Sequence, residues 1–387
     1  MKKRKIAVLL CSCLLAGLLA GCSGGNSETE DTGSDSGSQG GTIYVMTPAP
    51  DHGFTGQVGS YAEEMVDEIK AEGKYNAYLY TASDGSTQND QVDEIIANGD
   101  AAGVVFFAQD DSAAAGEEAL TAEGIPWLSF DRIIESTQDD SILAYSGNNW
   151  YVGAACAYWC VANGMTPDST LVQFTGDTSS ACQYRTEGFQ NFLLGEQDYY
   201  DSENDVTYSI TDVADAAWTQ EEVDALFGGN AYFEYECAWS NDNAKQYIES
   251  DLSSWIESAQ ASGSMYVFSM DDEMTMAFLE ILNDNTFSDD IKQSLADLNV
   301  YATAVGGMEE LYTVLRGEDE ALSPIADEYF DGLMSADFNP NMINSAIQYM
   351  VDYLDGNWEF QNGDTAYEDT FIVDSSNASE YEGFLGR

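Results

Sequence analysis

Residues 42–70 read TIYVMTPAPDHGFTGQVGSYAEEMVDEIK, and this stretch predicts the fold class of the chain. It begins with a short β-rich apolar run at 43–46. A helical segment follows in which Tyr61, Met65 and Ile69 share one face at helical spacing. A strand followed by an amphipathic helix is one β/α unit.

The same alternation continues along the chain. Further strands are expected near 77–81, 103–108 and 125–130, and the helices between them end at Gly99 and Gly124, which are typical C-terminal caps. Strands that alternate with helices in this way indicate a parallel sheet that is covered on both faces.

A second series of elements follows. It comprises a helix over about 150–163, a strand at 171–175 and a helix around 187–194, and then strands at 265–270 and 299–305. We find no sequence repeat between the two series. The pattern predicts an α/β protein with two doubly wound, Rossmann-like lobes and a ligand cleft between them.

The expected lobes are each built from two segments. The N-terminal lobe comprises 42–147 and 342–369, and the C-terminal lobe comprises 148–341 and 370–387. The stretch 201–238 is longer than one β/α unit needs and mixes acidic with aromatic residues without a clean period. Part of it is therefore interpreted as an insertion.

The N-terminus has the features of a lipoprotein signal peptide, expected at 1–21. Residues 2–5 are all basic, and the apolar run 6–20 is too short for a finished membrane span. Leu, Ala and Gly precede Cys22, whose thiol is expected to carry a diacylglyceryl group. A plain secretory signal or an uncleaved membrane helix are the alternatives.

Residues 22–41 are expected to form the lipidated cysteine and a disordered tether, because the run after Cys22 is almost wholly small and polar. Two acyl chains give a durable membrane anchor. We expect the protein on the extracellular face of the cytoplasmic membrane, in a bacterium with a single membrane.

The charge balance is strongly acidic. The 387 residues include 69 acidic and 12 basic side chains, which give a net charge of −57, and four of the basic residues lie in the signal peptide. Such a surface repels nucleic acid and anionic lipid, so neither is expected as a partner.

The cysteines do not predict a metal site or a redox site, because no CxxC pair occurs. The signal peptide and Cys22 account for three of the seven cysteines. The remaining four are interpreted as small buried hydrophobes, and they are Cys156, Cys160, Cys182 and Cys237. No cofactor is expected.

Ligands of open α/β sheets bind beyond the carboxyl ends of the strands. The residues that follow the expected strands are Asp51, His52, Gly53, Phe54, Asp131, Arg132, Gly176, Asp177, Arg185, Asp271, Asp272 and Glu273. Arginine donors, carboxylate acceptors and flat apolar rings suit a polyhydroxylated ring, and so they indicate a sugar. The alternative is that each arginine pairs with a carboxylate on a helix face.

Several sequence blocks resemble a known family in order and spacing. They are 43–45 with Phe54, 91–96, 124–126, 130–132, 185–189 and 267–274. Together they resemble the type I periplasmic sugar-binding proteins of the ribose and galactose class. The resemblance implies a monomer with two lobes and three hinge strands, which closes on one sugar, most simply a monosaccharide, and delivers it to an ABC permease.

The resemblance also implies roles for particular residues. Phe54 would stack on the sugar, Trp239 would face it from the second lobe in preference to Trp218, and Asn341 would make a polar hinge contact. Hydroxyl groups would be bound by the charged residues of the blocks. The complete set of expected ligand-binding residues is Asp51, Phe54, Asp131, Arg132, Arg185, Trp239, Asp271 and Asn341.

Two departures from the family pattern affect the ligand. The family usually carries an acidic residue where this chain has Gly-Gly-Met at 306–308. A hydroxyl contact is therefore missing or supplied elsewhere. The stretch 283–285 also lacks the glycine and spaced carboxylates of a calcium loop, so no metal is expected.

Two other classes of function stay open. An enzyme is disfavoured because His52 is the single histidine and no G-x-S-x-G or P-loop motif occurs, although a glycosidase that uses carboxylates alone remains conceivable. A same-fold nucleoside-binding lipoprotein, or a sugar sensor that presents its ligand to a membrane receptor, is the other alternative.

Overall fold

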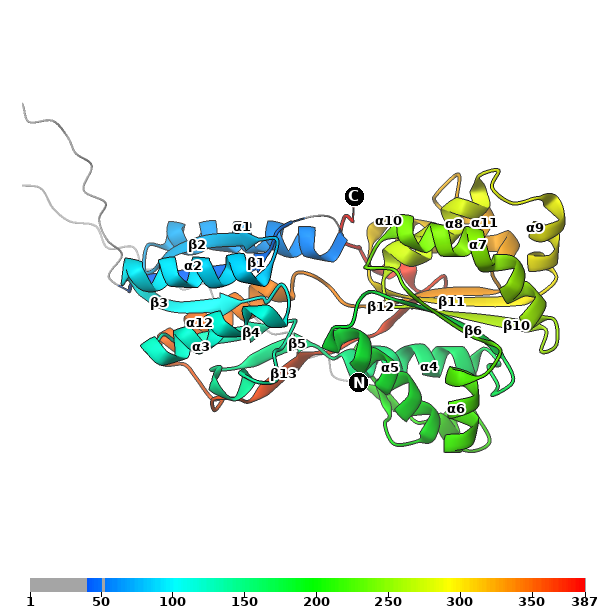
Figure 1. The fold of residues 1–387 in the computed structure, drawn as a ribbon, viewed down its shortest axis with the longest axis horizontal. Helices are drawn as coiled ribbons and strands as arrows, with labels where there is room; N and C mark the ends of the chain where they lie inside the picture. Colours follow the sequence, from blue (N-terminus) through cyan, green and yellow to red (C-terminus); the bar gives the residue numbers. More distant parts are fainter. Residues whose placement is uncertain (1–39, 51–52, 387) are drawn as a thin grey trace, which may run out of the picture. The chain divides into compact units, whose positions relative to one another are not determined.

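The computed structural model describes residues 40–50 and 53–386, so the expected signal peptide, Cys22, Asp51 and His52 lie outside the described residues. Within that part of the chain, two six-stranded sheets organise two α/β lobes (Figure 1). The predicted fold class is confirmed.

The first sheet has the strand order β13-β5-β4-β3-β1-β2, and every strand pair in it is parallel. Its strands and the helices that cover it are β1 (Thr42–Pro48), α1 (Gly53–Glu72), β2 (Asn76–Ala82), α2 (Gly85–Asn98), β3 (Ala101–Phe106), α3 (Ala114–Glu123), β4 (Trp127–Phe130), β5 (Ala144–Gly147), α12 (Met342–Leu354) and β13 (Thr365–Glu368).

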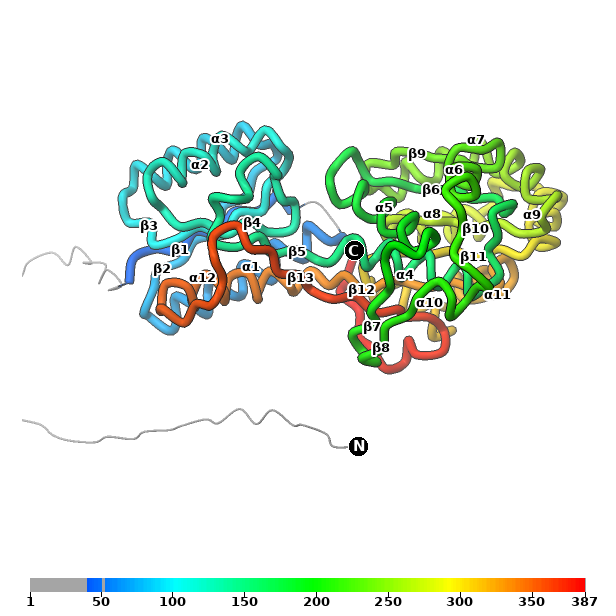
Figure 2. Tube along the Cα trace, turned by 90° about the horizontal axis from the view of Figure 1, so that it is seen from below, coloured from blue at the N-terminus to red at the C-terminus, as the bar shows by residue number. Residues whose placement is uncertain are grey.

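Side-chain alternation along β1 explains why helices cover both faces of this sheet. Ile43 and Val45 belong to one core with residues of α1 and α12, whereas Tyr44 and Met46 belong to another with residues of α2 and α3. Figure 2 shows α2 and α3 on one side of the strands and α1 and α12 on the other. Gly99 and Gly124 end α2 and α3 in the left-handed conformation that was expected of them.

The second sheet has the order β14-β12-β11-β10-β6-β9, and it is parallel except for the pair of β12 with β14. Its elements are α4 (Asn149–Ala162), β6 (Thr170–Thr175), α5 (Ser180–Leu194), α6 (Gln220–Gly228), β9 (Tyr232–Glu236), α7 (Asn241–Ala259), β10 (Ser264–Ser269), α8 (Asp272–Asn283), α9 (Asp289–Ala296), β11 (Asn299–Gly306), α10 (Glu309–Leu315), α11 (Ser323–Tyr329), β12 (Gly332–Asp337) and β14 (Ile372–Asp374).

The stretch 201–238 is only in part an insertion. A separate hairpin of β7 (Tyr199–Asp201) and β8 (Val206–Tyr208) stands outside both large sheets. The rest supplies α6 and the edge strand β9, which pairs in parallel with β6 as an ordinary α/β unit.

The chain passes between the two sheets three times: after β5, after β12 and after β13. These crossings place the carboxyl ends of strands from both sheets around one cavity. No helix among the described residues is long and apolar enough to cross a lipid bilayer.

Candidate functional site

A cavity of about 660 Å³ lies at the carboxyl ends of strands from both sheets. Six of the expected ligand-binding residues line it, and they are Phe54, Asp131, Arg132, Arg185, Trp239 and Asp271. Asn341 is exposed at the start of α12 and is not among the lining residues. The structure thus brings together residues that are up to 217 positions apart, from Phe54 to Asp271.

Arg185 is held in place from two directions. It projects from α5, is 5% exposed, and donates from Nε to Oδ1 of Asn149 at 2.8 Å and from Nη1 to the carbonyl oxygen of Met270. Its guanidinium lies 4.8 Å from the ring centre of Phe338 and 5.7 Å from that of Trp239. A planar donor between rings is suited to a hydroxylated ligand.

Arg132 and Asp131 form the opposite wall of the cavity, directly after β4. Arg132 donates to the carbonyl oxygen of Gln109 and lies 5.8 Å from the ring centre of Phe107. Asp131 has a left-handed backbone with φ of 59°. Burial raises the pKa of its carboxyl group to about 6, and the nearby Arg132 and Arg185 oppose that shift.

Neither arginine forms a salt bridge within the part of the chain that the structure describes. The alternative in which Arg132 and Arg185 merely pair with surface carboxylates therefore does not match their surroundings. Their remaining donors can face a ligand.

Asp271 lies directly before α8 and lines the cavity. Asp271 caps the helix by accepting from the backbone N–H of Glu273 at 2.6 Å. Burial, and then the charge of Asp272, raise its pKa well above the ordinary value. A partly buried carboxyl group of this kind, at the wall of a cavity, gains from a hydroxyl donor, which a sugar supplies.

Trp239 presents its ring by means of a strained backbone and a close contact. Its φ is 56°, and Nε1 donates to Oδ2 of Asp177 at 2.9 Å. A Cβ on Gly176 would lie 1.9 Å from the indole ring, so a glycine is required there. Burial works to raise the pKa of Asp177, but hydrogen bonds from Ser179 and Trp239 together outweigh it, so the pKa is lowered.

Phe54, on the first turn of α1, lies 5.4 Å from Phe338 between ring centres, at an angle of 48°. Phe338 follows β12, a strand that the sequence pattern did not predict, and so Phe338 was not expected at the site. Gln109 was not expected either, although it directly follows the predicted strand at 103–108, where ligands of open α/β sheets bind. Met308 lies in the Gly-Gly-Met segment that follows the predicted strand at 299–305, whereas Phe384 carries no strand-end or motif signal.

Four cysteines of the described residues are free and buried, as expected of small hydrophobes, and they are Cys156, Cys160, Cys182 and Cys237. Among the described residues, no group of histidine, cysteine and carboxylate side chains has the arrangement of a metal site.

Comparison with known families gives one match. Residues 43–357 match the family model described as "Periplasmic binding protein domain". A comparison with curated protein sequences finds no significant match.

Solved structures with a similar fold include three solute-binding proteins. The arabinose ABC transporter component from Shewanella sp. ANA-3, bound to α- and β-L-arabinofuranose, has a TM-score of 0.61 at 12% identity and covers 88% of this chain and 93% of its own. The Caulobacter myo-inositol-binding protein has 0.60 at 16%, with 88% and 95% covered. A Clostridium phytofermentans ABC transporter protein with bound β-D-glucose has 0.59 at 18%, also with 88% and 95%. These identities establish the fold alone.

Proposed function

This chain belongs to the periplasmic binding protein domain family, and we propose that it is the solute-binding component of an ABC transporter, which captures a sugar or polyol between its lobes. A monosaccharide is the proposed ligand, and an ABC permease is the proposed partner that receives it. Such a protein needs no catalytic group, and binding is its whole chemical task.

The observation that carries this proposal is the composition of the cavity. Arg132 and Arg185 supply planar donors, Asp131 and Asp271 supply partly buried acceptors, and Trp239 supplies an apolar face. A sugar ring has hydroxyl groups that donate and accept, and C–H faces that pack on aromatic rings. The similar structures from Shewanella, Caulobacter and Clostridium hold ligands of this class.

Ligand capture is proposed to involve closure of the two lobes, which we take as 42–147 with 342–369 and 148–341 with 370–387. The three chain crossings between the sheets would be the hinges. Asp131 and Arg132 come from one lobe, and Arg185 and Asp271 come from the other. Closure would therefore bring both sets of groups onto the same ligand.

We also propose that Cys22 anchors the protein by lipid to the outer face of the membrane, where a permease is within reach. The test is metabolic labelling with a palmitate analogue. Label should enter the wild-type protein and be absent from Cys22→Ala. Labelling of the variant would contradict the anchor without affecting the ligand proposal.

Thermal unfolding in the presence of small molecules tests the ligand class. Protein with Cys22→Ala is screened against monosaccharides, polyols and nucleosides. A ligand that binds the folded state alone raises the melting temperature by mass action. We expect stabilisation by a sugar or polyol. Stabilisation by nucleosides alone would overturn the proposal, and turnover of a glycoside would indicate a glycosidase instead.

A further inference from the structure

The last residues of the chain contribute to the cavity. We name residues 381–386 the C-terminal strap. Phe384 in the strap is 4% exposed and lines the cavity, whereas its neighbour Leu385 is 62% exposed. The strap therefore turns the aromatic ring of Phe384 inward and leaves the aliphatic side chain of Leu385 outside.

Backbone pairing fixes the position of Phe384. Its N–H donates to the carbonyl oxygen of Gly307 at 3.0 Å, and its carbonyl oxygen accepts from Glu309 at 2.8 Å. An isolated parallel bridge thus joins Phe384 to Met308, the residue between those partners. The ring is held against the loop that follows β11.

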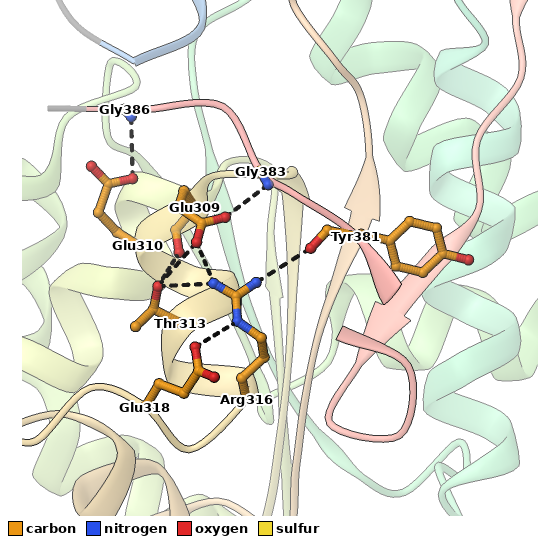
Figure 3. Close-up of polar contacts among 8 residues, drawn as sticks. All are labelled: Glu309, Glu310, Thr313, Arg316, Glu318, Tyr381, Gly383 and Gly386. Atoms are coloured by element: carbon orange, nitrogen blue, oxygen red, sulfur yellow. Dashed lines mark hydrogen bonds and ion pairs between the residues drawn. The ribbon is translucent and has the colours of Figure 1, made fainter. Parts of the chain in front are cut away.

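Side chains of α10 fix the rest of the strap (Figure 3). The N–H of Gly383 donates to Oε2 of Glu309 at 2.8 Å, and the N–H of Gly386 donates to Oε2 of Glu310 at 3.1 Å. Arg316 pairs with the other oxygen of Glu309 and so orients that carboxylate. Backbone N–H groups that bond to carboxylates form strong, charge-assisted hydrogen bonds.

The glycines of the strap allow it to approach this closely. A Cβ on Gly383 would lie 2.4 Å from the backbone nitrogen of Glu309, and one on Gly386 would lie 2.4 Å from Cε of Met308. The carbonyl oxygen of Gly386 also accepts from the N–H of Gly53, at the start of α1, at 3.0 Å. The strap thus reaches from the second lobe to the first.

The carboxylate of Asp272, beside the loop that follows β11, accepts hydrogen bonds from the protein itself. Oδ2 of Asp272 accepts from the N–H groups of Gly307 and Met308, both at 2.7 Å. Its Oδ1 accepts from the hydroxyl group of Ser335 at 2.7 Å. Both oxygens of Asp272 thus already accept hydrogen bonds from the protein's own donors.

Beside the strap and the loop after β11, the cavity wall has an apolar corner, which we define as Val305, Met308 and Phe384. All three residues line the cavity. These three side chains offer a ligand hydroxyl group no donor or acceptor in exchange for its hydrogen bonds to water. A C–H or methyl group would instead gain by leaving water.

We propose that the C-terminal strap is a specificity element, and that the apolar corner selects a sugar with a deoxy or methyl edge, such as a 6-deoxyhexose. This inference rests on the proposed sugar-binding function and deepens it. The polar residues around Arg185 and Asp131 would bind the hydroxylated remainder of the same ligand.

Calorimetric titration with matched sugars tests this inference. The probes are D-galactose, D-glucose and L-mannose, each paired with its 6-deoxy counterpart. We expect wild-type protein to bind one 6-deoxy sugar roughly tenfold or more tightly than its hydroxylated partner, as one hydrophobic subsite allows. Phe384→Ala should bring that ratio within about twofold, and Phe384→Leu should retain most of it. Leu385→Ala, one residue away and exposed, is the matched control and should change nothing.

The outcomes separate the inference from the function on which it rests. Preference for the hydroxylated partner, binding of a fully hydroxylated polyol alone, or an unchanged ratio in a folded Phe384→Ala would each overturn the inference and leave sugar or polyol binding intact. No binding of any sugar or polyol by the wild type would overturn both. Melting curves establish whether each variant is folded.

Discussion

Three residues that line the cavity have a left-handed backbone although none is glycine. Asp131, Ala238 and Trp239 have φ values between 52° and 59°. Such a conformation costs about 1–3 kcal/mol for each residue and persists where its surroundings enforce it. Here it directs Asp131 and Trp239 at the cavity. No sequence pattern indicated this, because tertiary packing imposes these dihedral angles.

Replacement of Arg185 by lysine tests the main donor of the cavity. Lysine cannot span Asn149 and Met270 with a planar fork, so we expect ligand affinity to fall by roughly 30–100-fold, or about 2–3 kcal/mol. Tryptophan fluorescence measures the affinity. Lys245→Arg keeps an ion pair with Glu280 outside the cavity and should bind as wild type does. Equal affinity in both variants would exclude Arg185 from binding.

Glu117 provides a pH dependence that is unrelated to the ligand. It is fully buried on α3 and accepts from the hydroxyl group of Thr137. Burial raises its pKa from 4.5 to about 7. The folded protein therefore retains this proton over a range in which the unfolded chain has lost it. Protonated Glu117 contributes to the free energy of unfolding in full below about pH 4.5, and this contribution is lost as the pH rises through about 7.

We expect Glu117→Gln to remove that loss. At pH 8 the variant should be more stable than wild type by on the order of 3 kcal/mol, and the difference should shrink toward pH 4.5. Urea unfolding at several pH values measures the free energy. Glu118→Gln removes the same charge from an exposed neighbour and should show a much smaller gain. Equal gains in both variants would attribute the effect to net charge.

At the scale of elements, close packing of α4 on α5 positions Arg185. A Cβ on Gly153 of α4 would lie 2.0 Å from the carbonyl oxygen of Arg185 on α5. Gly153→Ala should therefore displace α5, destabilise the fold by about 1–3 kcal/mol and weaken ligand binding. Differential scanning calorimetry and a binding titration measure the two effects.

Gly228→Ala is the matched control for that substitution. Gly228 ends α6, and nothing lies within 4 Å of the Cβ it lacks. The alanine should be neutral or stabilise the fold by up to about 1 kcal/mol, because it restricts the unfolded chain. Similar losses in both variants would mean that the packing of α4 on α5 is not the cause.

Helices and strands whose apolar residues recur with a clear periodicity were predicted. Strands that are buried only because they pair with other strands were missed. The periodic stretch 42–70 correctly predicted β1 and α1. By contrast, β12 reads GLMSAD and contains glycine, serine and aspartate, which are weak strand formers. Its pairing with β11 and β14 buries it, and that context is absent from local sequence.

At the scale of the whole molecule, the strand-end rule selected most of the polar cavity residues. Arg132 and Asp271 lie directly after predicted strands, Arg185 lies in the helix after the strand at 171–175, and all three line the cavity. Phe384 could not be selected in this way, because it reaches the cavity through backbone pairing with a loop 77 residues earlier at Gly307. The roles of Arg132, Arg185 and Asp271 in ligand binding stay predictions.

Closure of the lobes should be visible in solution. Three chain crossings connect the sheets, and polar groups from both sides line one cavity. We expect the radius of gyration from small-angle X-ray scattering to decrease when a saturating sugar is added. Arg185→Lys at the same sugar concentration should retain the larger value. An unchanged radius in wild type with proven sugar occupancy would contradict hinge closure.

Isothermal titration calorimetry of the Cys22→Ala protein against monosaccharides and polyols tests the proposed function most directly. We expect saturable binding of at least one such compound, at one site per chain. Binding of nucleosides with no heat from any sugar or polyol would contradict it.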